Sequence, residues 1–248
     1  MEHRRYQVLD TIRGLALLSM LLYHASWDLV YLFGLDWPWY HSFAAYVWQQ
    51  SICWTFILLS GYCWSLGRRQ LRRGMTVFLC GALITAVTWG FMPGSLVYCG
   101  VLTLLGASSL LLVLLAPALE RVPARAGLAG SFLLFLLFRD VNGGYLGFEG
   151  LGLAALPEGL YRDHFTALLG FPPADFFSTD YFSMLPWFFL FLTGYFLFRL
   201  RPEEAREIRR VPLVTWMGRH SLLLYMLHQP VIYGLMTLGH LLLTGATV

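Results

Sequence analysis

The chain has 248 residues, of which 58% are hydrophobic and only 12% are charged, and its formal net charge is +3. The apolar residues form long runs rather than amphipathic stripes, which is typical of a polytopic membrane protein and excludes an ordinary soluble domain. The small positive charge is explained by membrane topology and by contact with anionic inner-leaflet lipid, and it does not indicate nucleic acid as a partner. The cysteine spacing indicates no metal site.

The first apolar segment, residues 8–33, contains four ionisable side chains in a stretch otherwise apolar enough to cross a membrane: Asp10, Arg13, His24 and Asp28. An ionisable group in hydrocarbon costs several kcal/mol unless it is paired or faces a polar cavity, so this segment predicts a functional site. His24 and Asp28 are four residues apart, share one helix face and can hydrogen-bond. Asp10 and Arg13 either belong to the site or only pin the helix end at the interface.

Further stretches of roughly 20 apolar residues lie between charge clusters or turn signals. Together with the first they predict about seven spans, at residues 8–33, 42–66, 75–92, 96–118, 124–139, 181–199 and 212–243. The fifth is short, because only residues 126–138 are free of charge, and by length alone it suits a buried or re-entrant helix.

All seventeen basic residues are arginine. Most fall into clusters between the predicted spans, at Arg4 and Arg5, Arg68 to Arg73, Arg121 and Arg125, and Arg199 to Arg210. Seven crossings place every cluster on the cytoplasmic side, whereas loss of the fifth span would put the last cluster outside. We therefore predict an all-α transmembrane helix bundle that forms one domain over residues 1–248, with the N-terminus in the cytoplasm and the C-terminus outside.

Residues 141–179 separate the fifth and sixth predicted spans and are too long for a simple connection. Glycines and prolines interrupt any continuous helix there, while seven aromatic residues argue against disorder. We expect a structured external loop packed on the outer ends of the helices. It either shapes an acceptor site or only seals the bundle.

The last predicted span carries Arg219, His220 and His228. Counted from the preceding cytoplasmic arginine, His24 lies nineteen residues along the first helix and His228 eighteen along the last. At 1.5 Å per residue both rise about 27–29 Å, so we expect the two histidines at one depth. The ionisable residues at the starts of the two helices form a second, cationic layer near the cytoplasmic face.

Four groups of motifs, spread along nearly the whole chain, are informative in combination. They are Leu9 to Ala16 with His24 and Asp28, Leu169 to Pro172, Phe177 to Phe182 with Leu185 to Phe188, and Gly218 to Ser221 with Tyr225 and His228 to Pro230. In combination they resemble the bacterial members of the heparan-alpha-glucosaminide N-acetyltransferase catalytic-domain family, within the wider group of transmembrane acyltransferases.

The resemblance implies transfer of an acyl group, typically acetyl from acetyl-CoA, to an acceptor across the membrane, with the first-helix histidine central to the chemistry. Eukaryotic relatives carry a similar G-x-x-S-x-x-x-Y-x-x-H frame in the last helix, matched here by Gly218, Ser221, Tyr225 and His228. Bacterial relatives often show a histidine where this chain has Thr103. The chain has therefore either lost an interaction or changed its substrate.

His24, Asp28 and His228 are the expected catalytic residues. A neutral imidazole with a pKa near 6.5 suits removal of a proton from the acceptor, so His24 is the expected base. Asp28 would fix its tautomer and stabilise the imidazolium. His228 is a second base, an oxyanion donor or a partner of the backbone.

Binding roles follow from charge and position. Arg13 and Arg219 would hold donor phosphates, together with Asp10, His220 and Ser221. Asp180, Tyr181 and Trp187 are the expected acceptor contacts, although Asp180 would also suit a cap of the sixth helix and Trp187 would suit packing.

We predict a membrane-embedded O- or N-acyltransferase that moves an acetyl or other short acyl group from cytoplasmic acyl-CoA to an extracytoplasmic acceptor, a cell-envelope sugar. It needs no bound cofactor, contacts membrane lipid, is compatible with a homodimer, and belongs in the bacterial cytoplasmic membrane. The alternative is a proton-coupled transporter with a relay of His24, Asp28 and His228. Transporters usually have two related halves, and the pattern of the first helix is not repeated in the second half of the sequence.

Overall fold

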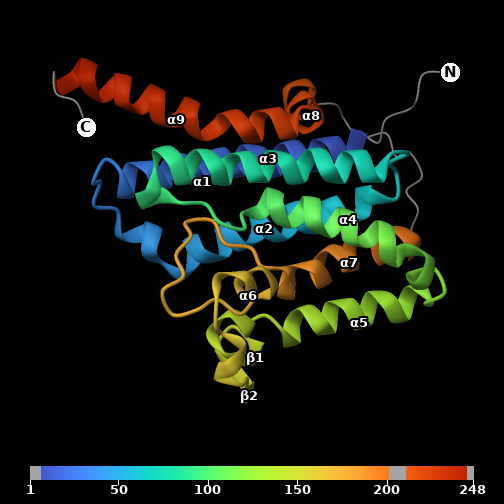
Figure 1. Cartoon of the computed structure of the whole chain (residues 1–248). Coiled ribbons are helices and arrows are strands. Elements are labelled where there is room, and N and C mark those ends of the chain that lie inside the picture. Colours follow the sequence, from blue (N-terminus) through green and yellow to red (C-terminus); the bar gives the residue numbers. More distant parts are fainter. Residues whose placement is uncertain (1–6, 201–210, 245–248) are drawn as a thin grey trace. The chain divides into compact units, whose positions relative to one another are not determined.

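The computed structural model describes residues 7–200 and 211–244. The chain divides into two compact units, one formed by residues 1–56 and 203–248 and the other by residues 57–202. Six of the arginines that we expect on the cytoplasmic side lie outside the described residues, at positions 4, 5, 201, 206, 209 and 210. Figure 1 gives the order of the elements along the chain.

The first unit is built on α1 (Gln7–Tyr31), which packs against α8 (Pro212–Arg219) and α9 (Ser221–Thr244). A 3-10 turn at Pro38–His41 and the first part of α2 (Phe43–Trp64) complete it.

Apolar side chains from three helices hold the first unit together. Leu17 and Met20 of α1 pack with Ile52 of α2 and Met217 of α8 in a buried cluster. In α1, Asp10 and Arg13 precede this apolar cluster, and His24 and Asp28 follow it. The cluster therefore holds in place the helix that carries all four ionisable residues.

The second unit consists of the end of α2, four further long helices and the segment between the last two of them. The helices are α3 (Gln70–Phe91), α4 (Val101–Leu119), α5 (Ala124–Leu137) and α7 (Met184–Leu200). They pack in the pairs α3 with α4 and α5 with α7. Phe135 of α5 and Phe191 of α7 are fully buried at its centre.

The segment that joins α5 to α7 is ordered, as the sequence predicts. It contains the antiparallel strands β1 (Tyr145–Phe148) and β2 (Leu151–Ala155), the helix α6 (His164–Leu169) and short 3-10 turns. The hairpin is an exception to the predicted all-α fold. Tyr181 fastens the segment, because its hydroxyl donates to the carbonyl of Ala167 at 2.6 Å.

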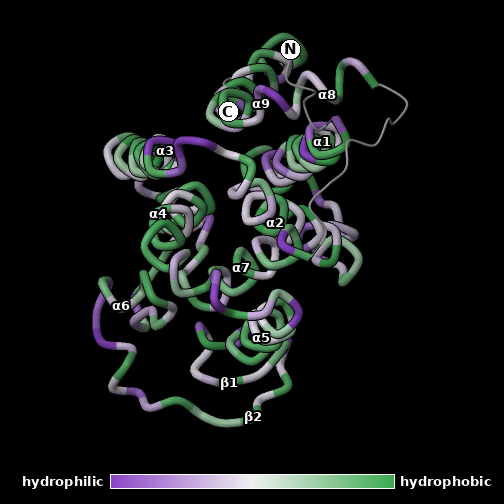
Figure 2. The backbone as a smooth tube through the Cα atoms, turned by 90° about the vertical axis from the view of Figure 1, so that its right-hand side faces the viewer, coloured by the Kyte–Doolittle hydropathy of each residue, from purple (hydrophilic) through white to green (hydrophobic). Residues whose placement is uncertain are grey.

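The apolar helices make this an integral membrane protein. Among the described residues, α1, α3, α4 and α9 are long and apolar enough to cross a membrane, and α5 and α7 are shorter apolar helices. Figure 2 shows hydrophobic residues along most of the helices, and more hydrophilic stretches in the chain between α5 and α7. The number of crossings and their direction remain predictions.

The predicted spans correspond to helices with two corrections. The fourth helix begins at Val101 rather than at residue 96, because Pro93–Ser95 forms a 3-10 turn ahead of it. The last span is two helices rather than one, since His220 has a non-helical backbone (φ −106°, ψ 22°) between α8 and α9.

Candidate active site

Two glycines bring α1 and α8 into backbone contact. A Cβ atom added at Gly14 would lie 1.9 Å from the carbonyl oxygen of Val214, and one added at Gly218 would lie 1.8 Å from that of Asp10. Only glycine permits this approach. The close crossing explains why an Arg-Gly pair on α1 meets a Gly-Arg pair on α8.

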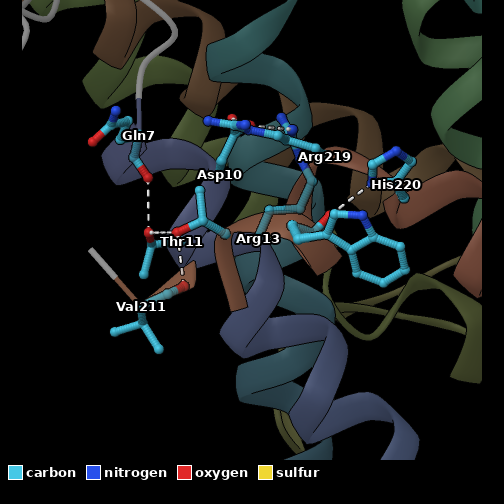
Figure 3. Close-up of polar contacts among 9 residues, drawn as sticks. Gln7, Asp10, Thr11, Arg13, Val211, Arg219 and His220 are labelled. Atoms are coloured by element: carbon cyan, nitrogen blue, oxygen red, sulfur yellow. Dashed lines mark hydrogen bonds and ion pairs between the residues drawn. The ribbon is translucent and has the colours of Figure 1, made fainter. Parts of the chain in front are cut away.

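The crossing assembles an arginine cluster, defined here as Asp10, Arg13 and Arg219. Asp10 lies between the two guanidinium groups, 3.4 Å from Nη1 of Arg13 and 3.3 Å from Nε of Arg219 (Figure 3). Two arginines share one carboxylate, so the cluster keeps a positive charge. Its side chains are partly exposed, which leaves room for an anionic ligand.

A hydroxyl contact braces the cluster. Thr11 and Thr215 lie with their hydroxyl oxygens 3.0 Å apart, linking α1 to α8. His220 turns away from the cluster in Figure 3, because its Nδ1 pairs with the carbonyl of Trp216 at 2.9 Å and its ring lies on that indole. The structure therefore brings together three of the five expected donor residues, while Ser221 begins α9 and His220 is exposed.

A second polar group lies farther along α1 and is called here the histidine cluster: His24, Asp28, His228 and Gln229. The ring centroids of His24 and His228 are 4.7 Å apart, edge to face. The two helices thus bring the histidines side by side, although the break at His220 means that the last helix is not the continuous one along which their depth was counted. Fourteen residues separate Asp10 from His24, so the two clusters lie about 21 Å apart along the helix.

His228 has a defined tautomer. Its Nδ1 lies against the backbone carbonyl of Tyr225, which can only accept a hydrogen bond, so Nδ1 carries the proton. In the neutral ring Nε2 then holds a lone pair. Nε2 is buried and has no hydrogen-bond partner among the described residues.

The expected hydrogen bond between His24 and Asp28 is absent. Asp28 is fully buried and accepts a 2.6 Å hydrogen bond from Nε2 of Gln229 instead. The reason is that α9 places an amide beside the carboxylate, and an amide N–H donates well to it. The second oxygen of Asp28 and the amide oxygen of Gln229 have no partner among the described residues.

Sequence reasoning missed Gln229 as part of this cluster. The available signal was an amide directly after His228 in an otherwise apolar helix. It also missed Tyr23, whose ring meets the edge of His24 at 6.1 Å. The sequence gives no signal that Tyr23 belongs to the site, because an aromatic residue in a membrane helix is equally well explained by packing.

The expected acceptor residues belong to the second unit. Asp180 accepts a hydrogen bond from the backbone N–H of Val101 at 3.2 Å, so it caps α4 rather than the sixth span. Trp187 is buried against Phe135 and Phe182, with the Arg139 guanidinium 5.0 Å from its ring centroid. Their contact with an acceptor remains a prediction.

Thr103, where relatives often have histidine, lies on α4 against α3. A Cβ added at Gly81 would come within 2.5 Å of the Thr103 hydroxyl oxygen. Residues 7–200 and 211–244 contain no group of three or more histidine, cysteine or acidic side chains that could hold a metal ion.

Apolar helices that carry a paired arginine cluster and a buried histidine cluster define an integral membrane protein with a polar site inside its helices. The family model described as heparan-alpha-glucosaminide N-acetyltransferase, catalytic, matches residues 5–230. The chain belongs to this family of membrane acyltransferases, which confirms the resemblance carried by the motifs. Comparisons with curated proteins and with solved structures gave no match.

Proposed function

We propose that the protein transfers an acetyl or other short acyl group from cytoplasmic acyl-CoA to an amine or hydroxyl of an extracytoplasmic acceptor, a cell-envelope sugar, in the bacterial cytoplasmic membrane. The observation that carries the proposal is the histidine cluster. Two imidazoles are in contact, and three buried polar atoms of the cluster have no hydrogen-bond partner in the part of the chain that the structure describes. Such groups are costly in an apolar helix pair unless a polar substrate binds to them.

The reaction assigns roles to the two histidines of this cluster. The acceptor oxygen or nitrogen attacks the thioester carbonyl and gives its proton to an imidazole nitrogen, Nε2 of His228 being held free for this by the Nδ1 contact. His24 lies against that ring and orients the acceptor or shares the proton. The C–S bond breaks, and the departing thiolate takes up the proton as CoA is released.

The arginine cluster supplies donor binding. Arg13 and Arg219 would contact the donor phosphates, and Asp10 holds the two guanidinium groups in a fixed relation. A donor bound there needs a long, thin acyl-carrying arm to bridge the distance of about 21 Å to the histidine cluster. Pantetheine in acyl-CoA has that form.

The proposal is tested with His24→Ala, His228→Ala and the double variant in an acyl-transfer assay on purified, lipid-reconstituted protein. Each single variant should lower kcat by about 10²–10⁴-fold, the usual contribution of general acid–base catalysis. If the two rings act as a unit, the double variant loses no more than the worse single variant.

His240→Ala is the matched control, since it removes an imidazole from the same helix beyond the cluster. It should retain wild-type turnover. Wild-type turnover in His24→Ala and His228→Ala would refute the proposed roles, and the proton-coupled transporter would then be the function to test.

A further inference from the structure

A pocket of 580 Å³ opens in the second unit where four helix ends meet. It is called here the basic pocket, and its walls include Trp64 at the end of α2, the start of α3, Glu120 after α4, and Tyr195 and Arg199 near the end of α7. Neither the proposed acyl transfer nor the donor site at Arg13 and Arg219 uses it.

The inner wall of the basic pocket is preformed. The indole N–H of Trp64 donates to the carbonyl of Ser109 at 3.1 Å, and its ring meets Tyr195 edge to face at 5.8 Å. Arg199 lies 5.9 Å from the centroid of the Tyr195 ring and donates to the carbonyl of Leu119 at 2.8 Å. An aromatic surface is thus held in place beside a guanidinium group that also closes the end of α4.

The mouth of the basic pocket is strongly positive. Arg68 and Arg69 lie there, exposed, and make no ion pair with another described residue. Arg199 adds a third positive charge, and Glu120 is the single carboxylate among the lining residues. The first turn of α3 also lines the pocket, and Arg69 at its N-cap provides no side-chain hydrogen bond to the N–H groups of that turn.

We propose that the basic pocket binds the phosphate ester group of an anionic ligand. A guanidinium group can donate two parallel hydrogen bonds to two phosphate oxygens. Arg68 and Arg69, which form no ion pair within residues 7–200 and 211–244, can bind a phosphate in this way. The organic part of the ligand then lies on Trp64 and Tyr195. Phosphate esters of this kind come from two sources, an anionic phospholipid headgroup of the inner leaflet or a soluble phosphate compound of the cytoplasm.

The test uses the full chain in lipid nanodiscs and two readouts. In the lipid arm, thermal denaturation is compared in phosphatidylcholine alone and with phosphatidylglycerol added. In the soluble arm, inorganic pyrophosphate is titrated calorimetrically into protein in phosphatidylcholine alone. The pocket variant is Arg68→Gln/Arg69→Gln. The matched control is Arg72→Gln/Arg125→Gln, which removes two exposed arginines that do not line the pocket.

A rise in Tm with phosphatidylglycerol that the pocket variant loses and the control keeps supports the proposal and identifies a lipid headgroup. Pyrophosphate binding that weakens at least tenfold in the pocket variant alone supports it and identifies a soluble ligand. The proposal is overturned if wild type responds in neither arm, or if the pocket and control variants respond alike in both. Because neither readout measures acyl transfer, such a failure would leave the proposed function standing.

Discussion

Single residues decide the chemistry of the histidine cluster. His228 is held by its own helix through Tyr225, whereas Asp28 of α1 is held across the helix pair by Gln229. The carboxylate therefore ties the two helices together instead of orienting His24. This makes Asp28 and Gln229 positioning residues for the proposed reaction, and their effect is expected first on stability.

Replacing Gln229 by leucine should lower the stability of the folded protein by about 1–3 kcal/mol, because the buried Asp28 loses its hydrogen-bond donor. The measurement is thermal unfolding in detergent. The double variant Asp28→Leu/Gln229→Leu removes both partners and should be less destabilised than Gln229→Leu alone. Simple additivity of the two substitutions would contradict the pairing.

Asp180 offers a pH-dependent prediction. Burial raises the pKa of its carboxyl from 3.8 to about 6, although the hydrogen bond from the Val101 N–H opposes the shift. A raised pKa means that the folded state holds the proton more tightly, so this contribution to stability is complete below 3.8 and is lost as the pH rises through about 6. Asp180→Asn still accepts from Val101 and should remove this part of the pH dependence. Identical profiles of Tm against pH for the two proteins would contradict the assignment.

Elements meet in this protein through glycines. Gly14 and Gly218 join α1 to α8, and Gly61 and Gly194 join α2 to α7 in the same reciprocal way, each facing a backbone carbonyl of the other helix. Small residues at such crossings are how membrane helices gain close packing without a hydrophobic driving force. The arginine cluster depends on the first of these crossings.

Gly218→Ala should separate α8 from α1, because the new methyl group would lie 1.8 Å from the Asp10 carbonyl oxygen. We expect a lower Tm and weaker apparent affinity for acyl-CoA as the bridge from Asp10 to Arg219 opens. Gly239→Ala is the control, since nothing lies within 4 Å of its added Cβ. Equal behaviour of the two variants in both assays would show that the crossing does not hold the arginine cluster.

Across the full fold, the sequence predicts the helices well and the contacts between them only partly. Apolar runs and charge clusters locate the helices. His24 and His228 do lie side by side, but the count that predicted it assumed one continuous last helix, and that helix is broken at His220. The hydrogen bond from Gln229 to Asp28 and the cap of α4 by Asp180 could not be predicted, because each depends on which helices are neighbours in space. Charge clusters and apolar periodicity report on each segment of the sequence separately, and they do not show which helices pack against one another.

We propose that this membrane acyltransferase carries out its chemistry at the histidine cluster. The most direct measurement is release of free CoA from acetyl-CoA by lipid-reconstituted wild type and His24→Ala, with and without a pool of envelope glycans. We predict release by wild type, its stimulation by a glycan fraction, and its loss in a His24→Ala protein that remains folded. Equal release by both proteins would remove His24 from the mechanism, and absence of release together with absence of CoA binding would contradict the acyltransferase function itself.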